Sequence, residues 1–182
     1  MNICVFCGSS FGINSIYSDT ANELGRLIAT TKSTLVYGGG NVGLMGILAD
    51  SVMAHGGEVV GVIPGFLLRR EVAHQGVTRL EVVETMHERK KRMADLSDAF
   101  IAMPGGWGTL DELAEILTWK QLGLIQSTIG LLNINSYFDH LILQMQVMAT
   151  HGFLNTENLQ SLKIASDPGD LLTQLGLVSS YS

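Results

Sequence analysis

The run Pro104-Gly105-Gly106-Trp107-Gly108-Thr109 contains the residue types and spacing that most directly suggest chemistry. It follows an apolar stretch typical of a buried strand, 99–102, and precedes apolar residues at helical spacing, Leu113, Ile116, Leu117 and Leu124. A glycine-rich turn between a strand and a helix N-terminus directs backbone N–H groups at an anion, and the helix dipole favours negative charge there. The run therefore predicts a phosphate site, with the carboxylate of Glu112 one turn into the helix.

The end of the same run also has a purely structural interpretation. Thr109 and Glu112 form the pattern T-x-x-E, a capping box in which the two side chains satisfy backbone N–H groups at the start of a helix. Such a cap does not require the glycines that precede it. Asp111 and Glu112 would repel a phosphate directly beside them. We therefore expect the phosphate of a sugar-phosphate ligand to bind the backbone amides, and Glu112 to lie beside its sugar.

A second candidate is an arginine that faces inward from a predicted helix, 86–96. At 100° per residue, Met86, Met93 and Leu96 define the apolar face of this helix, and Arg89 falls among them. A buried unpaired charge is very costly, so Arg89 needs an anionic partner. Two interpretations remain open: an internal salt bridge or snorkelling stem, or a cleft position where Arg89 meets a phosphate or the glutamate of the glycine-rich run.

The histidines show no ligand spacing. His87 is the nearest candidate for a proton shuttle, although its predicted direction is sideways from the apolar face of its helix. We expect the other four to be surface or loop residues: His55, His74, His140 and His151.

A second glycine turn contains GxGxxG at Gly38, Gly40 and Gly43, between a predicted strand and a predicted helix. A dinucleotide fingerprint also needs an acid at the end of the next strand to hold the ribose. Here that strand, 58–63, begins with Glu58 and ends without an acid, which disfavours NAD. We interpret the turn as a mononucleotide site or a cavity wall; a tight turn with close helix–sheet packing remains the alternative.

Composition excludes several classes of protein. With 46% hydrophobic and 15% charged residues, the chain is not disordered. A net charge of −6 argues against a nucleic-acid partner. No uninterrupted apolar stretch is long enough to span a bilayer, and the first residues lack a basic leader, so we expect a cytoplasmic protein without a membrane partner.

The two cysteines, Cys4 and Cys7, form a CxxC pair inside a predicted strand. Zinc would need a second pair of ligands, and none has suitable spacing. Residues three apart in a strand point to opposite faces. We therefore expect two reduced structural thiols and no metal site.

The 182 residues predict a single nucleotide-binding domain, 1–182. Strands are expected at 3–7, 34–37, 58–63, 78–83, 99–103, 129–132 and 162–165, and helices at 17–29, 44–55, 86–96, 109–122, 137–148 and 169–175. Apolar strands that alternate with helices indicate a parallel sheet covered on both faces. Right-handed crossovers then give a Rossmann-like, doubly wound α/β fold with its site at the C-terminal strand ends.

Four motifs in this order resemble the LONELY GUY (LOG) family: Cys7-Gly8-Ser9-Ser10, Tyr37-Gly38-Gly39-Gly40, Met86-His87-Glu88-Arg89-Lys90 and the run from Pro104 to Glu112. The resemblance extends from Ile3 to about Leu132. Family members are cytokinin riboside 5′-monophosphate phosphoribohydrolases, some with the older label lysine decarboxylase, and some also cleave AMP. The resemblance implies a hydrolase for purine riboside 5′-monophosphates that needs no cofactor and forms homodimers.

The resemblance also implies which residues act. The catalytic pair falls on Arg89 and Glu112. The implied substrate contacts are Glu71, Lys90, Gly105, Gly106, Trp107, Gly108, Thr109, Leu110, Asp111 and Thr118. Two positions depart from the common pattern, since Trp107 stands where tyrosine is usual and Asp111 where glutamate is usual. Both keep the chemical type, although the larger indole would narrow the pocket for the base.

Three other functions are possible on this fold. A nucleotide-binding module without catalysis, such as a carrier or sensor, would keep the glycine turns but would not need Arg89 and Glu112 together. A pyridoxal-phosphate decarboxylase needs a Schiff-base lysine, and none of the five lysines has a recognisable cofactor context. An NAD-dependent oxidoreductase is disfavoured by the missing acid after the second glycine turn.

Overall fold

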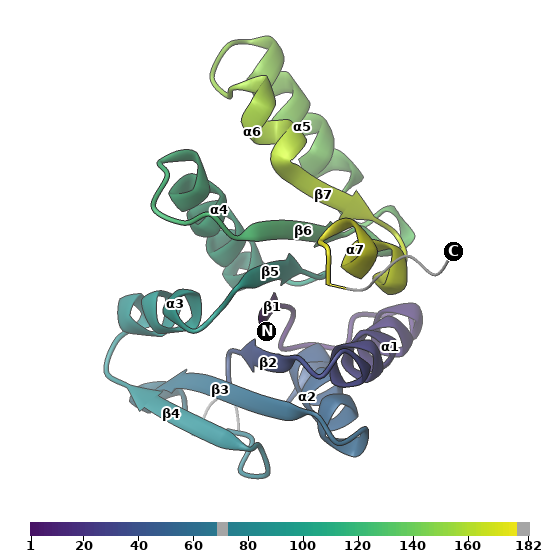
Figure 1. Cartoon of the computed structure of the whole chain (residues 1–182), viewed down its shortest axis with the longest axis vertical. Helices are drawn as coiled ribbons and strands as arrows, with labels where there is room; N and C mark the ends of the chain where they lie inside the picture. Colours follow the sequence, from purple (N-terminus) through teal and green to yellow (C-terminus); the bar gives the residue numbers. More distant parts are fainter. Residues whose placement is uncertain (69–72, 178–182) are drawn as a thin grey trace.

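The apolar runs that the sequence predicts as strands pair side by side in one parallel sheet (Figure 1). The computed structural model describes residues 1–68 and 73–177. Within them, seven strands lie in the order β4-β3-β2-β1-β5-β6-β7. Their bounds are β1 Asn2–Phe6, β2 Thr34–Tyr37, β3 Glu58–Pro64, β4 Arg79–Val83, β5 Ala99–Ala102, β6 Thr128–Leu132 and β7 Leu162–Ala165.

Helices cover both faces of this sheet (Figure 1). They are α1 Ile16–Thr30, α2 Gly43–Ala54, α3 Met86–Asp95, α4 Trp107–Gln121, α5 Asp139–Thr150, α6 Thr156–Ser161 and α7 Pro168–Gln174, with short 3-10 turns at Gly65–Leu67 and Ile134–Ser136. One buried core joins the sheet to α1, α2 and α7. A second core, on the other face, joins it to α3, α4 and α5. The Rossmann-like, doubly wound α/β fold is therefore confirmed.

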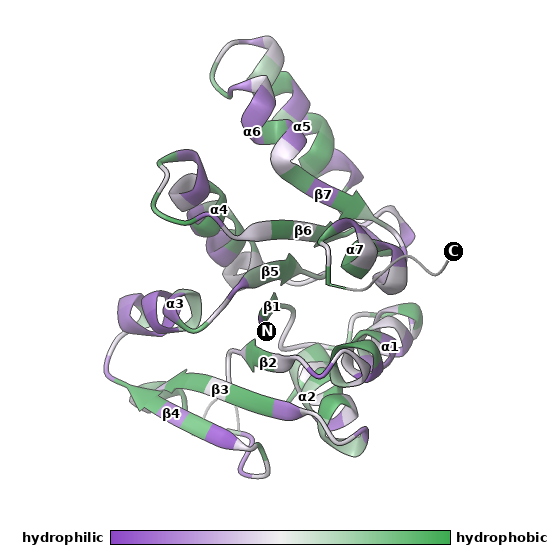
Figure 2. Ribbon diagram, viewed as in Figure 1, coloured by the Kyte–Doolittle hydropathy of each residue, from purple (hydrophilic) through white to green (hydrophobic). Residues whose placement is uncertain are grey.

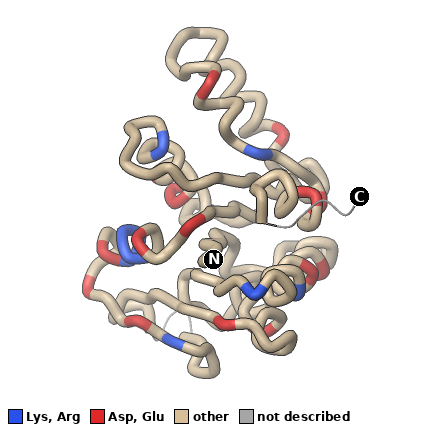
Figure 3. The backbone as a smooth tube through the Cα atoms, in the orientation of Figure 1, with Lys and Arg blue, Asp and Glu red and all other residues tan. Residues whose placement is uncertain are grey.

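Charge and hydropathy follow the same layering. The four central strands β1, β2, β5 and β6 contain no charged residue, and Figure 2 shows hydrophobic residues along the strands and hydrophilic ones on the outer helices. Lysines and arginines gather on α3 together with acidic residues (Figure 3). Across the described residues, no helix combines the length and apolar character needed to cross a membrane.

The predicted elements are all present, with ends shifted by one or two residues. Helix α6 is not among the predicted elements, because its six residues are too few to show helical periodicity. Its start is marked by Asn155, whose side chain accepts a hydrogen bond from the Glu157 amide at 2.8 Å.

The strand order reverses between β1 and β5, and this reversal determines where a ligand can bind. The segment after β1 leads to α1 on one face of the sheet, whereas the segment after β5 leads to α4 on the other. Where neighbouring connections diverge in this way, a crevice opens at the C-terminal strand ends. The glycine-rich run 104–109 follows β5 directly and therefore lies at this crevice.

Helices α1 and α2 approach so closely at Gly25 that their backbones are nearly in contact. A Cβ atom at Gly25 would lie 2.8 Å from the Leu48 carbonyl oxygen and 2.6 Å from the Ser51 Cβ. The Ser51 hydroxyl also donates a hydrogen bond of 2.6 Å to the Asn22 carbonyl, which fixes the spacing of the two helices.

We expect Gly25→Ala to destabilise the protein even though alanine is the better helix former. The gain in helix propensity is about 1 kcal/mol, whereas forcing a methyl group into a packed contact costs about 1–3 kcal/mol, and here the obstacle is backbone. Urea unfolding measures the difference. Gly169→Ala is the control, because a Cβ there meets only the Asp167 carboxylate at 3.2 Å. Equal stability of the two variants would contradict this account of the α1–α2 contact.

Candidate functional site

A cavity of about 180 Å³ opens at the C-terminal ends of β1 and β5. Four parts of the chain form its wall: the end of β1 with the turn that follows, the second glycine turn with α2, helix α3, and the glycine-rich run with α4. The lining residues are Val5, Phe6, Cys7, Gly8, Ser9, Gly38, Met45, Arg89, Met93, Gly106, Trp107, Gly108, Thr109 and Glu112. The cavity thus lies at the point where the strand order reverses.

The glycine-rich run presents the N-terminus of α4 to this cavity. Helix α4 begins at Trp107 with Gly106 as its N-cap, and no side chain caps it. The first bond of the helix runs from the Leu110 amide to the Gly106 carbonyl at 3.2 Å. The amides of the first turn have no acceptor within the helix, and together with the helix dipole they form a site suited to an anion.

The predicted capping box at Thr109 and Glu112 is wrong. Because α4 starts two residues earlier than expected, Thr109 lies inside the first turn and its side chain does not cap the helix. It is buried against the turn instead: a Cβ at Gly105 would lie 2.1 Å from the Thr109 hydroxyl. Glu112 consequently lies in the second turn and lines the cavity beyond the free amides.

Arg89 reaches the same cavity from α3 and is only 5% exposed. Its Nε donates to the Val62 carbonyl at 3.2 Å and its Nη2 to the Gly38 carbonyl at 2.8 Å. The guanidinium is therefore held by main-chain oxygens of β3 and of the turn after β2. Arg89 and Glu112 both lie in the wall of one cavity, as the cleft interpretation expects.

The second glycine turn serves as part of this wall. A Cβ at Gly38 would lie 2.0 Å from the Arg89 Nη2, so only glycine leaves room for the guanidinium. Gly43 has φ +63°, and a Cβ there would lie 2.3 Å from the backbone of Ser9 and Ser10. The turn thus brings the segments after β1 and β2 into close contact, as the cavity-wall interpretation expected.

The two cysteines are free and buried on opposite faces of the sheet, as predicted. Burial raises the pKa of the Cys7 thiol strongly, and the negative charge of Glu112 raises it further. Burial and Glu112 also raise the pKa of Cys4, while a hydrogen bond with Ser97 and the charge of Arg89 oppose this shift. Both thiols are therefore neutral in the folded protein near pH 7.

Several implied substrate contacts lie outside the cavity. Lys90 pairs with Asp111 at 3.1 Å and with Glu115 at 3.3 Å, and lines a small hollow behind Glu112. Burial lowers the pKa of Lys90, but these two carboxylates outweigh it and raise the pKa overall. Gly105 is part of the glycine-rich run but does not line the cavity.

Two further implied contacts, Leu110 and Thr118, line a different cavity. Glu71, like its neighbours Arg69 and Arg70, lies outside the described residues.

Among the histidines, His74 lies in a loop, as predicted, and is buried there. It is 7% exposed, and its Nε2 lies 2.9 Å from the Asp50 carboxylate on α2. His87 is exposed on α3 and does not line the cavity. Within 1–68 and 73–177, no group of three or more histidine, cysteine or acidic side chains is arranged to hold a metal ion.

Sequence reasoning missed Tyr137, which follows β6. Its hydroxyl donates a hydrogen bond of 2.6 Å to the carbonyl of Gly105 inside the glycine-rich run. The pairing of β6 with β5 is the signal that could have indicated this contact, because the segments that follow neighbouring parallel strands emerge at the same edge of the sheet.

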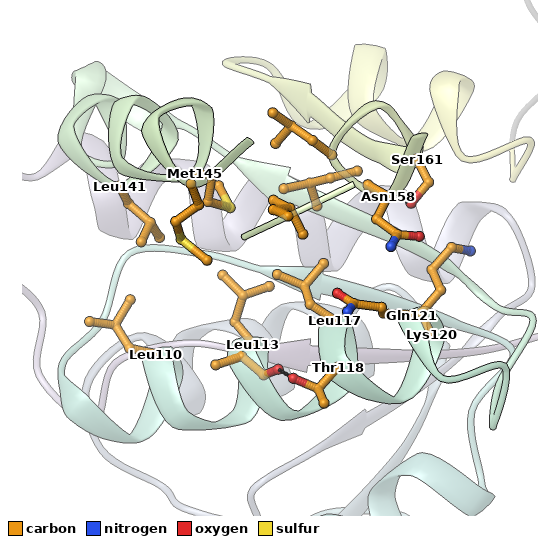
Figure 4. Close-up of a pocket in the computed structure, with 15 residues that line it drawn as sticks. Leu110, Leu113, Leu117, Thr118, Lys120, Gln121, Leu141, Met145, Asn158 and Ser161 are labelled. Atoms are coloured by element: carbon orange, nitrogen blue, oxygen red, sulfur yellow. Dashed lines mark hydrogen bonds between the residues drawn. The ribbon is translucent and has the colours of Figure 1, made fainter. Parts of the chain in front are cut away.

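A larger cavity of about 320 Å³ lies between α4, α5 and α6 (Figure 4). Its lining is mainly aliphatic, with Leu110, Leu113, Leu117, Leu141 and Met145 directed into it and Lys120, Gln121, Asn158 and Ser161 at one end. It lacks the helix N-terminus and the arginine–glutamate combination of the first cavity. The cavity at the strand ends is therefore the candidate functional site.

Comparisons with known proteins point to one family. The family model described as "Possible lysine decarboxylase" matches residues 45–175. Over 95% of its length the chain is 43% identical to the probable cytokinin riboside 5′-monophosphate phosphoribohydrolase LOGL2 of Oryza sativa subsp. japonica, of which it covers 71%. Over the same share it is 44% identical to the cytokinin riboside 5′-monophosphate phosphoribohydrolase LOG4 of Arabidopsis thaliana, of which it covers 80%.

Solved structures confirm the fold. The X-ray structure of TM1055 superposes with a TM-score of 0.75 at 20% identity, covering 97% of this chain and 99% of that one. The molybdenum cofactor binding protein from the phototrophic bacterium Rippkaea orientalis gives a TM-score of 0.72 at 24% identity, covering 96% and 94% of the two chains. At these identities the likeness concerns the architecture alone.

The raised thiol pKa values predict a loss of stability at alkaline pH. Cysteines in the unfolded state titrate near a pKa of about 8.5, whereas the buried thiols of the folded state keep their protons. Above this pH the unfolded state therefore binds fewer protons than the folded state. The free energy of unfolding should then fall above pH ~8.5 by about 1.4 kcal/mol per pH unit for each thiol.

Urea unfolding between pH 7 and 9.5 under reducing conditions measures this slope. In Cys7→Ser, where one thiol is missing, we expect the free energy of unfolding to fall less steeply with pH than in the wild type. An unchanged slope in this variant would contradict the role of Cys7.

Proposed function

The chain belongs to the LONELY GUY (LOG) family, and from that premise we propose that it is a phosphoribohydrolase that cleaves the N-glycosidic bond of a purine riboside 5′-monophosphate. The products are the free base and ribose 5-phosphate. One observation carries the proposal: Arg89 and Glu112 line the same cavity as the uncapped N-terminus of α4. A cation, a carboxylate and an anion-binding helix end are the groups that this reaction requires.

The 5′-phosphate binds the amides of the first turn of α4, at Gly106 to Thr109. Pockets that enclose a drug-sized ligand measure about 300–1,000 Å³, so a cavity of 180 Å³ suits the phosphoribose part of a nucleotide. The base then extends towards the opening, where Trp107 is 88% exposed at the rim. Binding energy from the phosphate fixes the sugar and so places C1′ at the catalytic groups.

Glu112 acts on the sugar. Breaking the glycosidic bond develops oxocarbenium character on the ribose, and a carboxylate beside the ring stabilises this positive charge. The same carboxylate orients or deprotonates the water that attacks C1′. The position of Glu112 in the second turn of α4 keeps it away from the amides that hold the phosphate, which separates the two negative groups.

Arg89 is the second catalytic residue. The carbonyls of Val62 and Gly38 fix its guanidinium, so its charge is in place before substrate binds. Two roles fit this position: it neutralises the phosphate, or it polarises the leaving base. In this proposal the further substrate contacts are those the resemblance implies, among them Glu71, Lys90 and Asp111, and the substrates are AMP and cytokinin ribotides such as isopentenyladenosine 5′-monophosphate.

A nucleotide carrier or sensor on the same fold is the second candidate. The molybdenum cofactor binding protein with the same architecture shows that this fold also occurs in a protein named for cofactor binding. A carrier, however, has no need for a buried arginine and a glutamate in one cavity. The curated relatives at 43–44% identity, whose names describe enzymes, also favour catalysis.

The protein is in this proposal a cytoplasmic homodimer that binds neither membranes nor nucleic acid. Free buried thiols suit a reducing compartment, and the net charge of −6 disfavours a polyanion. Exposed apolar side chains occur on α5 and on the segments after α4 and α5: Leu122, Leu124, Leu143, Val147, Met148 and Phe153. In this proposal they form one surface, which we call the apolar face. Monomers rarely expose large apolar patches, so this face suits a second copy.

A dimer would also account for Thr118. Within one chain this residue lines the larger cavity rather than the one that contains Glu112. Its implied contact with substrate therefore requires a second copy.

Leu143→Glu should convert the dimer to a monomer, because Leu143 is 56% exposed on α5 and a charge in an apolar interface is costly. Size-exclusion chromatography with light scattering should give twice the 19.6 kDa of one chain for the wild type. Ile13→Glu is the control, since Ile13 is fully exposed before α1 and distant in sequence from this face. A wild-type mass of one chain would refute the dimer.

Glu112→Gln should lower turnover about 10²–10³-fold, as is typical when a group that stabilises the transition state is lost, while nucleotide binding persists. Chromatographic detection of free base from AMP and from isopentenyladenosine 5′-monophosphate measures this. The corresponding nucleosides serve as substrate controls, and Glu23→Gln, on the outer surface of α1, is the matched variant. Full turnover in Glu112→Gln would remove Glu112 from the mechanism. Binding without any release of base in the wild type would favour the carrier.

A further inference from the structure

Tyr137 contacts the glycine-rich run from outside the motifs that define the family. Its hydroxyl donates a hydrogen bond of 2.6 Å to the Gly105 carbonyl, from the segment between β6 and α5. We propose that Tyr137 is a positioning residue that orients the Gly105–Gly106 peptide, so that the Gly106 amide faces the 5′-phosphate. This inference rests on the proposed function, because the phosphate belongs to its substrate.

The peptide bond is planar, so the directions of its C=O and N–H groups are coupled. In a trans peptide the C=O of one residue and the N–H of the next point in opposite directions, and the chain has no cis peptide among its described residues. Fixing the Gly105 oxygen on Tyr137 therefore directs the Gly106 N–H the other way. Gly106 lines the cavity, whereas Gly105 does not. The preceding peptide is fixed similarly, since the Pro104 carbonyl accepts a hydrogen bond from the Gly8 amide at 3.1 Å.

The run needs such an external restraint because its own residues cannot provide one. Glycines have wide conformational freedom, yet Gly105 cannot be replaced by a stiffer residue. A Cβ there would lie 2.1 Å from the Thr109 hydroxyl and 2.8 Å from the Gly8 amide nitrogen. A hydrogen bond from a neighbouring segment restrains the backbone without filling this space.

Tyr137 itself is held firmly. Its ring contacts the Tyr17 ring edge-on at 5.9 Å and the Phe138 ring at 4.9 Å. Asn133 accepts a hydrogen bond from the Phe138 amide at 2.7 Å. The two residues before Tyr137 have positive φ, 49° at Asn135 and 59° at Ser136. Side chains disfavour this conformation, which persists where the surroundings enforce it and occurs often at functional sites.

Tyr137→Phe tests the proposal, because it removes the hydroxyl and keeps the ring contacts. Tyr17→Phe is the matched control: it makes the same change in the same aromatic pair but leaves the bond to Gly105 intact. Calorimetric titration with ribose 5-phosphate measures binding, and initial rates with AMP give KM and kcat. Loss of one hydrogen bond should raise the dissociation constant and the KM about fivefold in Tyr137→Phe, with kcat unchanged and the control like the wild type.

Three results would overturn the inference, and they are distinguishable. If ribose 5-phosphate binds the wild type and Tyr137→Phe equally well, the hydroxyl does not position the amide. If kcat falls together with a rise in KM, or if the melting temperature drops markedly, the role of Tyr137 is general support of the fold. If the wild type neither binds ribose 5-phosphate nor releases base from AMP, the proposed function is wrong, and the inference about Tyr137, which rests on it, is wrong as well.

Discussion

A buried guanidinium is the constraint on which the rest of the site depends. Charged groups are rarely buried without partners, because desolvation costs more than any single contact returns. Arg89 meets this requirement by donating to carbonyl oxygens of two different segments, at Val62 in β3 and at Gly38 after β2. Helix α3 is thereby tied to the carboxyl ends of two strands. The position of the positive charge is thus set by the backbone of the sheet.

Sheet topology places a carboxylate and an uncapped helix N-terminus at one cavity. The segments after β1 and β5 diverge to opposite faces, and α4 starts at the resulting crevice without a side-chain cap. An uncapped helix end costs stability in most proteins, and here it leaves amides available for a ligand. The second turn of the same helix contributes Glu112. In the proposed function, one rigid element therefore provides both the phosphate contacts and the carboxylate, at a spacing that the helix itself determines.

Much of this arrangement could be predicted from periodicity. The inward direction of Arg89 follows from the 3.6-residue repeat of α3, and the place of the site follows from apolar strands that alternate with helices. The start of α4 could not be read in the same way, because Trp107 and Gly108 are weak helix formers and Thr109 imitates an N-cap. The burial of His74 depends on a tertiary partner 24 positions away, and the contact of Tyr137 with Gly105 spans 32 positions. Such contacts leave no mark on local sequence patterns.

The fit between Gly38 and Arg89 has an evolutionary consequence. The space that any side chain at position 38 would need is already filled by the guanidinium. A larger residue at position 38 therefore displaces the guanidinium unless residue 89 is shorter, and either change moves or removes the positive charge of the cavity. The two positions are epistatic, because the effect of a substitution at one depends on the residue at the other. Divergence that keeps Arg89 in place is easier at the rim of the cavity, where Trp107 is exposed, than at its floor.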